Sequence, residues 1–83
     1  MSSEQAFAEY EAAAKALTRT VKREYPAGAS CYAVTAHGHT IQARVIGHGN
    51  SWSRPDEVWV RNVVTGSTHW RPFKSITIDE AKP

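Results

Sequence analysis

Apolar positions recur at a helical period in the first quarter of the chain. They are three or four residues apart, the spacing of one face of an amphipathic helix. The members of this stripe are Phe7, Tyr10, Ala14, Leu17 and Val21. Ser2, followed three residues later by Gln5, is typical of a capping box, and Pro26 is a helix terminator. We therefore predict an amphipathic α-helix over about residues 3–23.

The period changes to two after residue 30, which indicates β-strands. The predicted strands are residues 31–36, 39–46, 57–64, 67–71 and 76–78. Gly38 and Gly66 are typical of tight turns, because glycine tolerates a positive φ. Segment 47–56 is rich in Gly, Ser, Asn and Pro and is predicted to be a loop. The predicted fold class is mainly β (α+β), with residues 1–83 as one domain and 79–83 as a polar tail.

The register of the third and fourth predicted strands decides which side chains share a face. If Gly66 is the bulge residue of the turn, Arg61 lies opposite His69 and Trp59 opposite Arg71. One face then collects Trp59, Arg61, His69 and Arg71, and the other collects Val58, Val60 and Trp70. A tight two-residue turn would mix apolar and charged side chains on both faces, so the bulged register is favoured.

Three stretches resemble an SH3-like small β-barrel of the Tudor type. Residues 43–47 are similar to its second strand, 58–62 with 65–66 to its third strand and distal hairpin, and 71–76 to its single 3₁₀ turn. The resemblance covers residues 28–78 and implies a five-stranded SH3-like barrel over about residues 30–78. Sm-like RNA-binding proteins also place a helix before five strands, but their Asp/Asn loop motif is not recognisable here. The aromatic cage of Tudor domains is not carried over, because no motif brings Tyr32, Trp52 and Phe73 together.

Composition and charge exclude several classes of protein. One cysteine excludes an internal disulfide, and no apolar run approaches the ~20 residues of a membrane span. The first ten residues lack the layout of a secretory signal, so we expect a cytoplasmic location. The net charge of +2 is too small to select a partner by itself. Size and composition also suit a phage or mobile-element accessory protein.

The strand region nevertheless carries an excess of cations, four of which are arginines. Arginine and tryptophan side chains on one surface are typical of single-stranded nucleic-acid binding and of protein interfaces. The candidate binding residues are Trp59, Arg61, His69, Arg71, Trp52, Arg54, Arg44 and Lys74. The expected function is a non-enzymatic module that binds nucleic acid. The alternatives are a host-protein adaptor or inhibitor and an Sm-like oligomeric RNA binder, with the helical stripe as a seam for homo-oligomers.

Catalysis and metal binding are the remaining functional hypotheses. His69 between Arg61 and Arg71 would suit a small nuclease, but no carboxylate lies in register to orient it. His37 and His39 flank a glycine at a predicted turn, without a zinc-site motif. Cys31 begins a strand and is expected to be a small buried residue. We therefore expect no catalytic residue, no metal and no cofactor.

Overall fold

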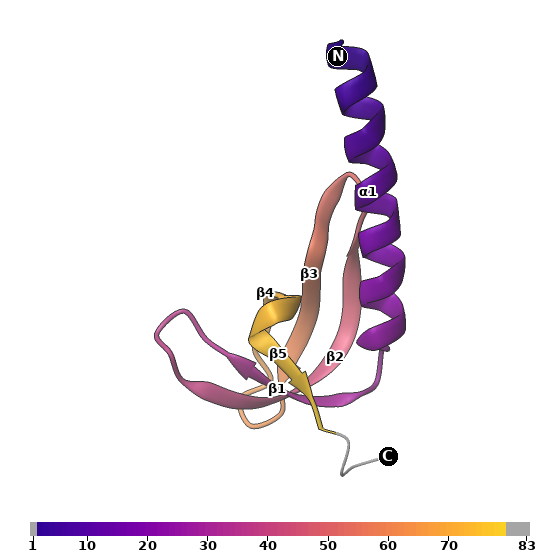
Figure 1. Ribbon diagram of the computed structural model, residues 1–83. Coiled ribbons are helices and arrows are strands. Elements are labelled where there is room, and N and C mark those ends of the chain that lie inside the picture. Colours follow the sequence, from indigo (N-terminus) through magenta and orange to yellow (C-terminus); the bar gives the residue numbers. More distant parts are fainter. Residues whose placement is uncertain (1, 80–83) are drawn as a thin grey trace.

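The fold consists of one helix followed by a five-stranded antiparallel sheet, as predicted. The computed structural model describes residues 2–79; most of the predicted polar tail, residues 80–83, lies outside this range. The elements are α1 (Ser3–Glu24), β1 (Ser30–Val34), β2 (Thr40–Asn50), β3 (Ser53–Asn62), β4 (Thr68–Pro72), the 3₁₀ turn η1 (Phe73–Ser75) and β5 (Ile76–Ile78). Figure 1 shows α1 alongside the long β2–β3 hairpin.

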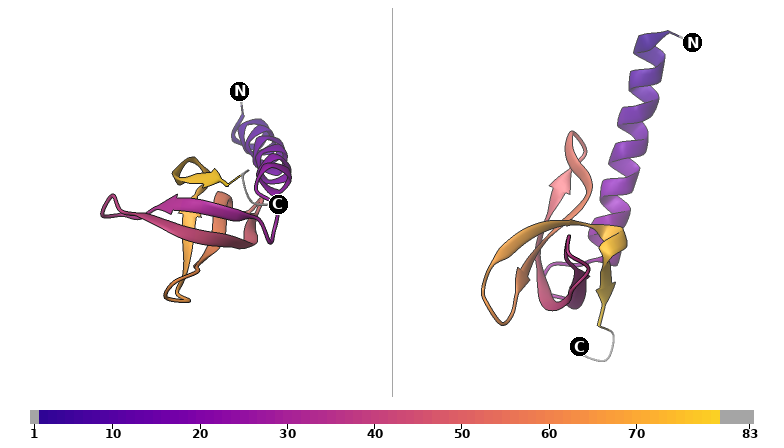
Figure 2. Two further views of the ribbon diagram at one scale, coloured as in Figure 1. Left: turned by 90° about the horizontal axis from the view of Figure 1, so that it is seen from below. Right: turned by 90° about the vertical axis from the view of Figure 1, so that its left-hand side faces the viewer.

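Helix α1 begins at the predicted capping box. The Ser2 side chain accepts a hydrogen bond from the Gln5 N–H at 3.1 Å, and the Ser2 N–H donates to the Gln5 side chain at 3.4 Å. Only the C-terminal half of the helix packs on the sheet, through the buried side chains of Ala14, Thr18 and Val21. The N-terminal half extends past the tip of the β2–β3 hairpin (Figures 1 and 2). The predicted seam is therefore divided between a buried and an exposed half.

The strands follow the order β4-β3-β2-β1-β5. Strands β1 to β4 pair in chain order, β1 with β2, β2 with β3 and β3 with β4. Strand β5 pairs with β1, where Ala33 lies opposite Ile76. Strands β4 and β5 are thus the two edges of the sheet, joined by η1.

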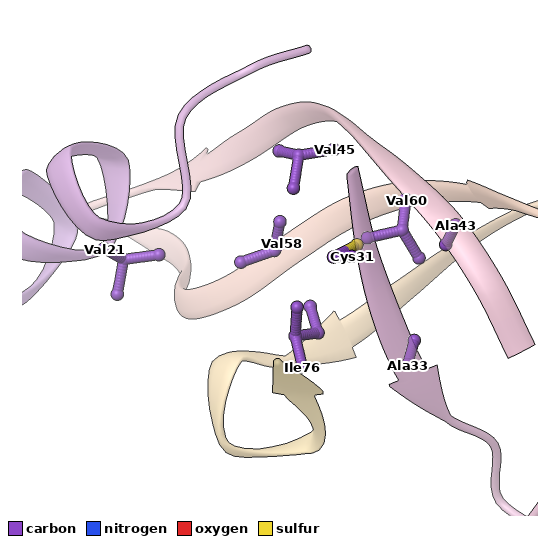
Figure 3. Close-up of a cluster of buried hydrophobic side chains, with 8 residues drawn as sticks. All are labelled: Val21, Cys31, Ala33, Ala43, Val45, Val58, Val60 and Ile76. Atoms are coloured by element: carbon purple, nitrogen blue, oxygen red, sulfur yellow. The ribbon is translucent and has the colours of Figure 1, made fainter. Parts of the chain in front are cut away.

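The core lies on the face of the sheet that α1 covers (Figure 3). Valine is the largest residue type among the fully buried side chains, and burying one contributes roughly 1.5 kcal/mol or more. The core residues are Val21, Cys31, Ala33, Ala43, Val45, Val58, Val60 and Ile76. These small and medium side chains let α1 and the sheet approach closely.

The predicted loop at 47–56 is wrong, because β2 and β3 continue as a hairpin through most of it. Only Ser51 and Trp52 form the turn at its tip. The pairing of β2 with β3 shifts register between Val45 and Gly47 and again between His48 and Asn50, so some residues at these two points have no direct partner on the opposite strand. Of the two glycines that suggested a loop, Gly49 is instead needed for the close approach of the strands, because it lies against the Arg54 carbonyl group.

The predicted register of β3 and β4 is also wrong, by one residue. Trp59 lies opposite Trp70 and Val60 opposite His69. The turn is longer than predicted: the Asn62 N–H donates to the Ser67 carbonyl oxygen at 2.8 Å, which leaves four residues between them. The Asn62 side-chain oxygen accepts hydrogen bonds from the N–H groups of Val64 and Thr65 and stabilises this turn.

The β1–β2 turn differs from the prediction in the same way. The Thr35 N–H donates to the His39 carbonyl oxygen at 2.7 Å, so the turn holds three residues, Ala36, His37 and Gly38. Gly38 has a φ of +81°, the left-handed conformation expected for glycine in such a turn.

Candidate nucleic-acid interface

The observed register divides the predicted binding face. Directly opposed residues of antiparallel strands point to the same side of the sheet. His69 lies opposite Val60 and Arg71 opposite Val58, so both side chains share the side of the core valines. Trp70, which the prediction placed with those valines, lies instead beside Trp59 on the other side. We call that side, away from the core, the outer face; its residues are Arg44, Glu57, Trp59, Arg61, Thr68 and Trp70.

Two tryptophans form an aromatic cluster on the outer face. The ring centroids of Trp59 and Trp70 are 4.6 Å apart, and the rings meet edge to face at 81°. The guanidinium carbon of Arg54 lies 5.1 Å from the centroid of the Trp70 ring, within the range of a cation–π contact. Arg54 also forms an ion pair with Glu57 at 2.7 Å. Both indoles are half-buried, so part of each ring remains exposed beside these charges.

Arginines lie directly opposite each other on neighbouring strands. Arg44 of β2 faces Arg61 of β3, and both side chains are exposed. Arg44 donates one hydrogen bond to the Gly28 carbonyl oxygen at 3.3 Å. The ion pair found within residues 2–79 joins Arg54 and Glu57. Neither Arg44 nor Arg61 has a carboxylate partner among these residues. This pair concentrates positive charge next to the indole of Trp59.

The remaining predicted binding residues lie apart from this cluster. Trp52, at the tip of the β2–β3 hairpin, is 83% exposed, and Lys74 is exposed in η1. Arg71 is half-buried, and its Nε atom is buried without a hydrogen-bond partner. The structure therefore brings together Arg44, Arg54, Trp59 and Arg61 of the predicted set and adds Trp70.

A basic groove that the sequence analysis missed lies between α1 and the hairpin tip. It has a volume of about 330 Å³. Its lining residues are Lys15, Thr18, Arg19, Lys22, Asn50, Ser51 and Trp52. The spacing of Lys15, Arg19 and Lys22 is that of one helix face and could have indicated it. The position of the hairpin tip could not be predicted, because the composition of segment 47–56 is typical of a loop.

The groups considered for catalysis and metal binding are dispersed. Cys31 is buried, and desolvation raises the pKa of its thiol above the ordinary 9.0, which disfavours the nucleophilic thiolate. His48 Nε2 lies 2.5 Å from the Tyr25 carbonyl oxygen and links β2 to the end of α1. Among residues 2–79, no group of three or more His, Cys, Asp or Glu side chains could hold a metal ion.

Helix α1, the one α-helix among the described residues, is not apolar enough to cross a membrane. Comparison with known proteins gives no match: no family model, no curated protein and no solved structure is significantly similar to the chain. The chemistry of its own residues is therefore the guide to function.

Proposed function

We propose that the chain is a non-enzymatic module that binds single-stranded nucleic acid through the outer face of its sheet. The observation that carries the proposal is the direct opposition of Arg44 and Arg61. Like charges at directly opposed positions destabilise a sheet. The hydrogen bond to Gly28 gives Arg44 a role in the fold but gives no reason for Arg61 beside it. A phosphate group between the two guanidinium groups would turn the repulsion into two charge-assisted hydrogen bonds.

The tryptophans supply the second part of the interface. Trp59 follows the arginine pair on the same face, and the edge-to-face contact with Trp70 holds its ring in place. A base stacked on an exposed indole contributes about 1–3 kcal/mol without requiring a particular sequence. Phosphates on Arg44 and Arg61 with bases on the tryptophans would let one strand run across β2, β3 and β4. An acidic protein partner is the competing occupant of this face.

The sheet order supports an SH3-like small barrel as the fold type. Five strands in the order β4-β3-β2-β1-β5, with a 3₁₀ turn before the last strand, agree with the resemblance noted in residues 28–78. We include this fold type in the proposal.

The same geometry argues against a nuclease. Catalysis by His69 would require a neighbouring cation that stabilises the phosphate in the transition state. The register directs His69 and Arg61 to opposite sides of the sheet, so the predicted set of His69 between Arg61 and Arg71 is not assembled. We therefore assign no catalytic role to His69, and we expect a labelled RNA incubated with the protein to remain intact.

Binding is tested by fluorescence anisotropy with a labelled oligothymidylate of about 12 nucleotides, within the range of roughly 4–16 nucleotides that one OB-fold covers. Affinity should fall between about 50 and 200 mM salt, because each phosphate contact releases counterions. Arg61→Gln should reduce the slope of log affinity against log salt by about 0.7, the value of one lost contact on a single strand. The affinity itself should fall about tenfold, the loss expected for one charged hydrogen bond.

Arg23→Gln is the matched control, because Arg23 is an exposed cation of α1 outside the outer face. It removes the same charge and should leave the slope unchanged. Equal effects of the two variants would mean that binding reports only net charge. Salt-independent or undetectable binding of the wild type would overturn the proposal and favour a protein partner.

A further inference from the structure

The projecting half of α1 leaves large apolar side chains exposed. Phe7 is 61% exposed, Tyr10 60% and Trp52, at the nearby hairpin tip, 83%. A groove of about 430 Å³ runs between them, lined by Phe7, Tyr10, Glu11, Lys15, Ser51 and Trp52. It shares Lys15, Ser51 and Trp52 with the basic groove, so the two form one channel along α1. An aromatic patch of this kind, bordered by charges, is typical of an interaction site.

The charges along this flank of α1 have a symmetric arrangement. Glu4, Glu11, Lys15 and Lys22 follow one another at spacings of seven, four and seven residues. These spacings keep all four on one side of a helix. The first two are acidic and the last two basic, and two of them, Glu11 and Lys15, line the aromatic groove. The flank is therefore complementary in charge to its own reversed copy.

We infer that this channel binds the projecting half of α1 from a second copy of the chain, with the two helices antiparallel about a two-fold axis level with Ala13. Glu11 and Lys15 are each two residues from Ala13, and Glu4 and Lys22 are each nine residues from it. In an antiparallel pair, Glu11 of one copy thus meets Lys15 of the other, and Glu4 meets Lys22. By symmetry each contact forms twice.

Further positions on this flank of α1 fit the same pairing. Phe7 and Arg19 are each six residues from Ala13, so an aromatic ring of one copy meets a guanidinium group of the other. Ala8, five residues from Ala13, is exposed and has a small side chain, so the helices can approach closely there. The partner helix would also cover Phe7, Tyr10 and Trp52, the apolar side chains left exposed in one copy.

Alternative reasons for the charge order account for only part of it. The helix dipole favours acids in the first turn and bases in the last, which explains Glu4 and Lys22 but not Glu11 and Lys15 in the middle. Among residues 2–79, Glu11 and Lys15 form no ion pair with each other, so a contact within the helix does not explain them. A nucleic acid in the channel would use the lysines but would be repelled by Glu4 and Glu11, whereas a second copy uses all four.

Charge exchange between two variants tests the pairing and its orientation. Light scattering coupled to size-exclusion chromatography should show a wild-type dimer. Glu4→Lys/Glu11→Lys and Lys15→Glu/Lys22→Glu should each dissociate, with the dimer weakened about 30-fold or more by the loss of several exposed pairs. An equimolar mixture of the two should be dimeric again, because every contact then joins opposite charges.

The control is Glu9→Lys/Glu24→Lys, which changes the net charge as much as Glu4→Lys/Glu11→Lys does but lies outside the channel. It should leave the dimer intact, and circular dichroism should show the helix folded in every variant. A monomeric wild type, or a mixture that stays monomeric, would overturn the inference. A monomer whose oligonucleotide binding is lost in Lys15→Glu/Lys22→Glu would assign the channel to nucleic acid instead. Arg44 and Arg61 are unchanged throughout, so dimerisation and outer-face binding can fail separately.

Discussion

At the scale of single residues, the closest approach of β2 and β3 depends on a missing side chain. A Cβ atom at Gly49 would lie 1.9 Å from the Arg54 carbonyl oxygen, far inside van der Waals contact. Arg54 itself has a φ of 58°, a left-handed conformation that non-glycine residues seldom adopt. The backbone at this point therefore positions the guanidinium group over Trp70, and Gly49 makes that backbone conformation accessible.

Gly49→Ala should therefore destabilise the fold and disturb the aromatic cluster. We expect a loss of about 2 kcal/mol in the free energy of unfolding, since backbone atoms must move to admit the methyl group. Gly47→Ala is the control: its Cβ would meet only the Trp59 Cβ, at 3.8 Å. Urea unfolding monitored by tryptophan fluorescence measures both. Equal stability of the two variants would show that the close approach at Gly49 is not required.

At the scale of elements, the helix and the strands could be predicted, whereas the connections could not. Capping and periodicity act locally, so Ser2 and Gln5 predict the start of α1, and the alternation of 39–46 predicts β2 without its last four residues. The number of residues in a turn depends on whether one further backbone hydrogen bond forms between the two strands. Thr65–Gly66 is compatible with both a three-residue and a four-residue turn. The side chain of Asn62 decides the outcome, and its effect was not anticipated. Because of this shift by one residue, His69, Trp70 and Arg71 each lie on the side of the sheet opposite to the predicted one.

Asn62→Ala tests this account of the β3–β4 turn. Removing the side-chain oxygen leaves the N–H groups of Val64 and Thr65 without their acceptor, and we expect a loss of about 1 kcal/mol, as for a helix cap. Val64→Ala, at a side chain that is 82% exposed in the same turn, should change stability little. Thermal unfolding compares the two. An unchanged melting temperature in Asn62→Ala would mean that the turn is held by its backbone alone.

At the scale of the whole molecule, the length of the β2–β3 hairpin decides which surfaces remain free. The stripe along α1 was visible in the sequence, but its division was not, because it depends on where Ser51 and Trp52 place the hairpin tip. Of the predicted binding residues, Arg44, Trp59 and Arg61 share the outer face. His69 and Arg71 lie on the other side because of the register of β4. Register is a property of two paired strands and is not encoded in one segment alone.

The most direct test of the outer face follows the indole N–H signals of the three tryptophans by NMR. A ¹⁵N-labelled sample would be titrated with the oligothymidylate at low salt. We predict that the signals of Trp59 and Trp70 shift in proportion to bound oligonucleotide, while that of Trp52, at the hairpin tip, stays in place. A shift confined to Trp52, or no shift of any indole at saturating oligonucleotide, would contradict the account.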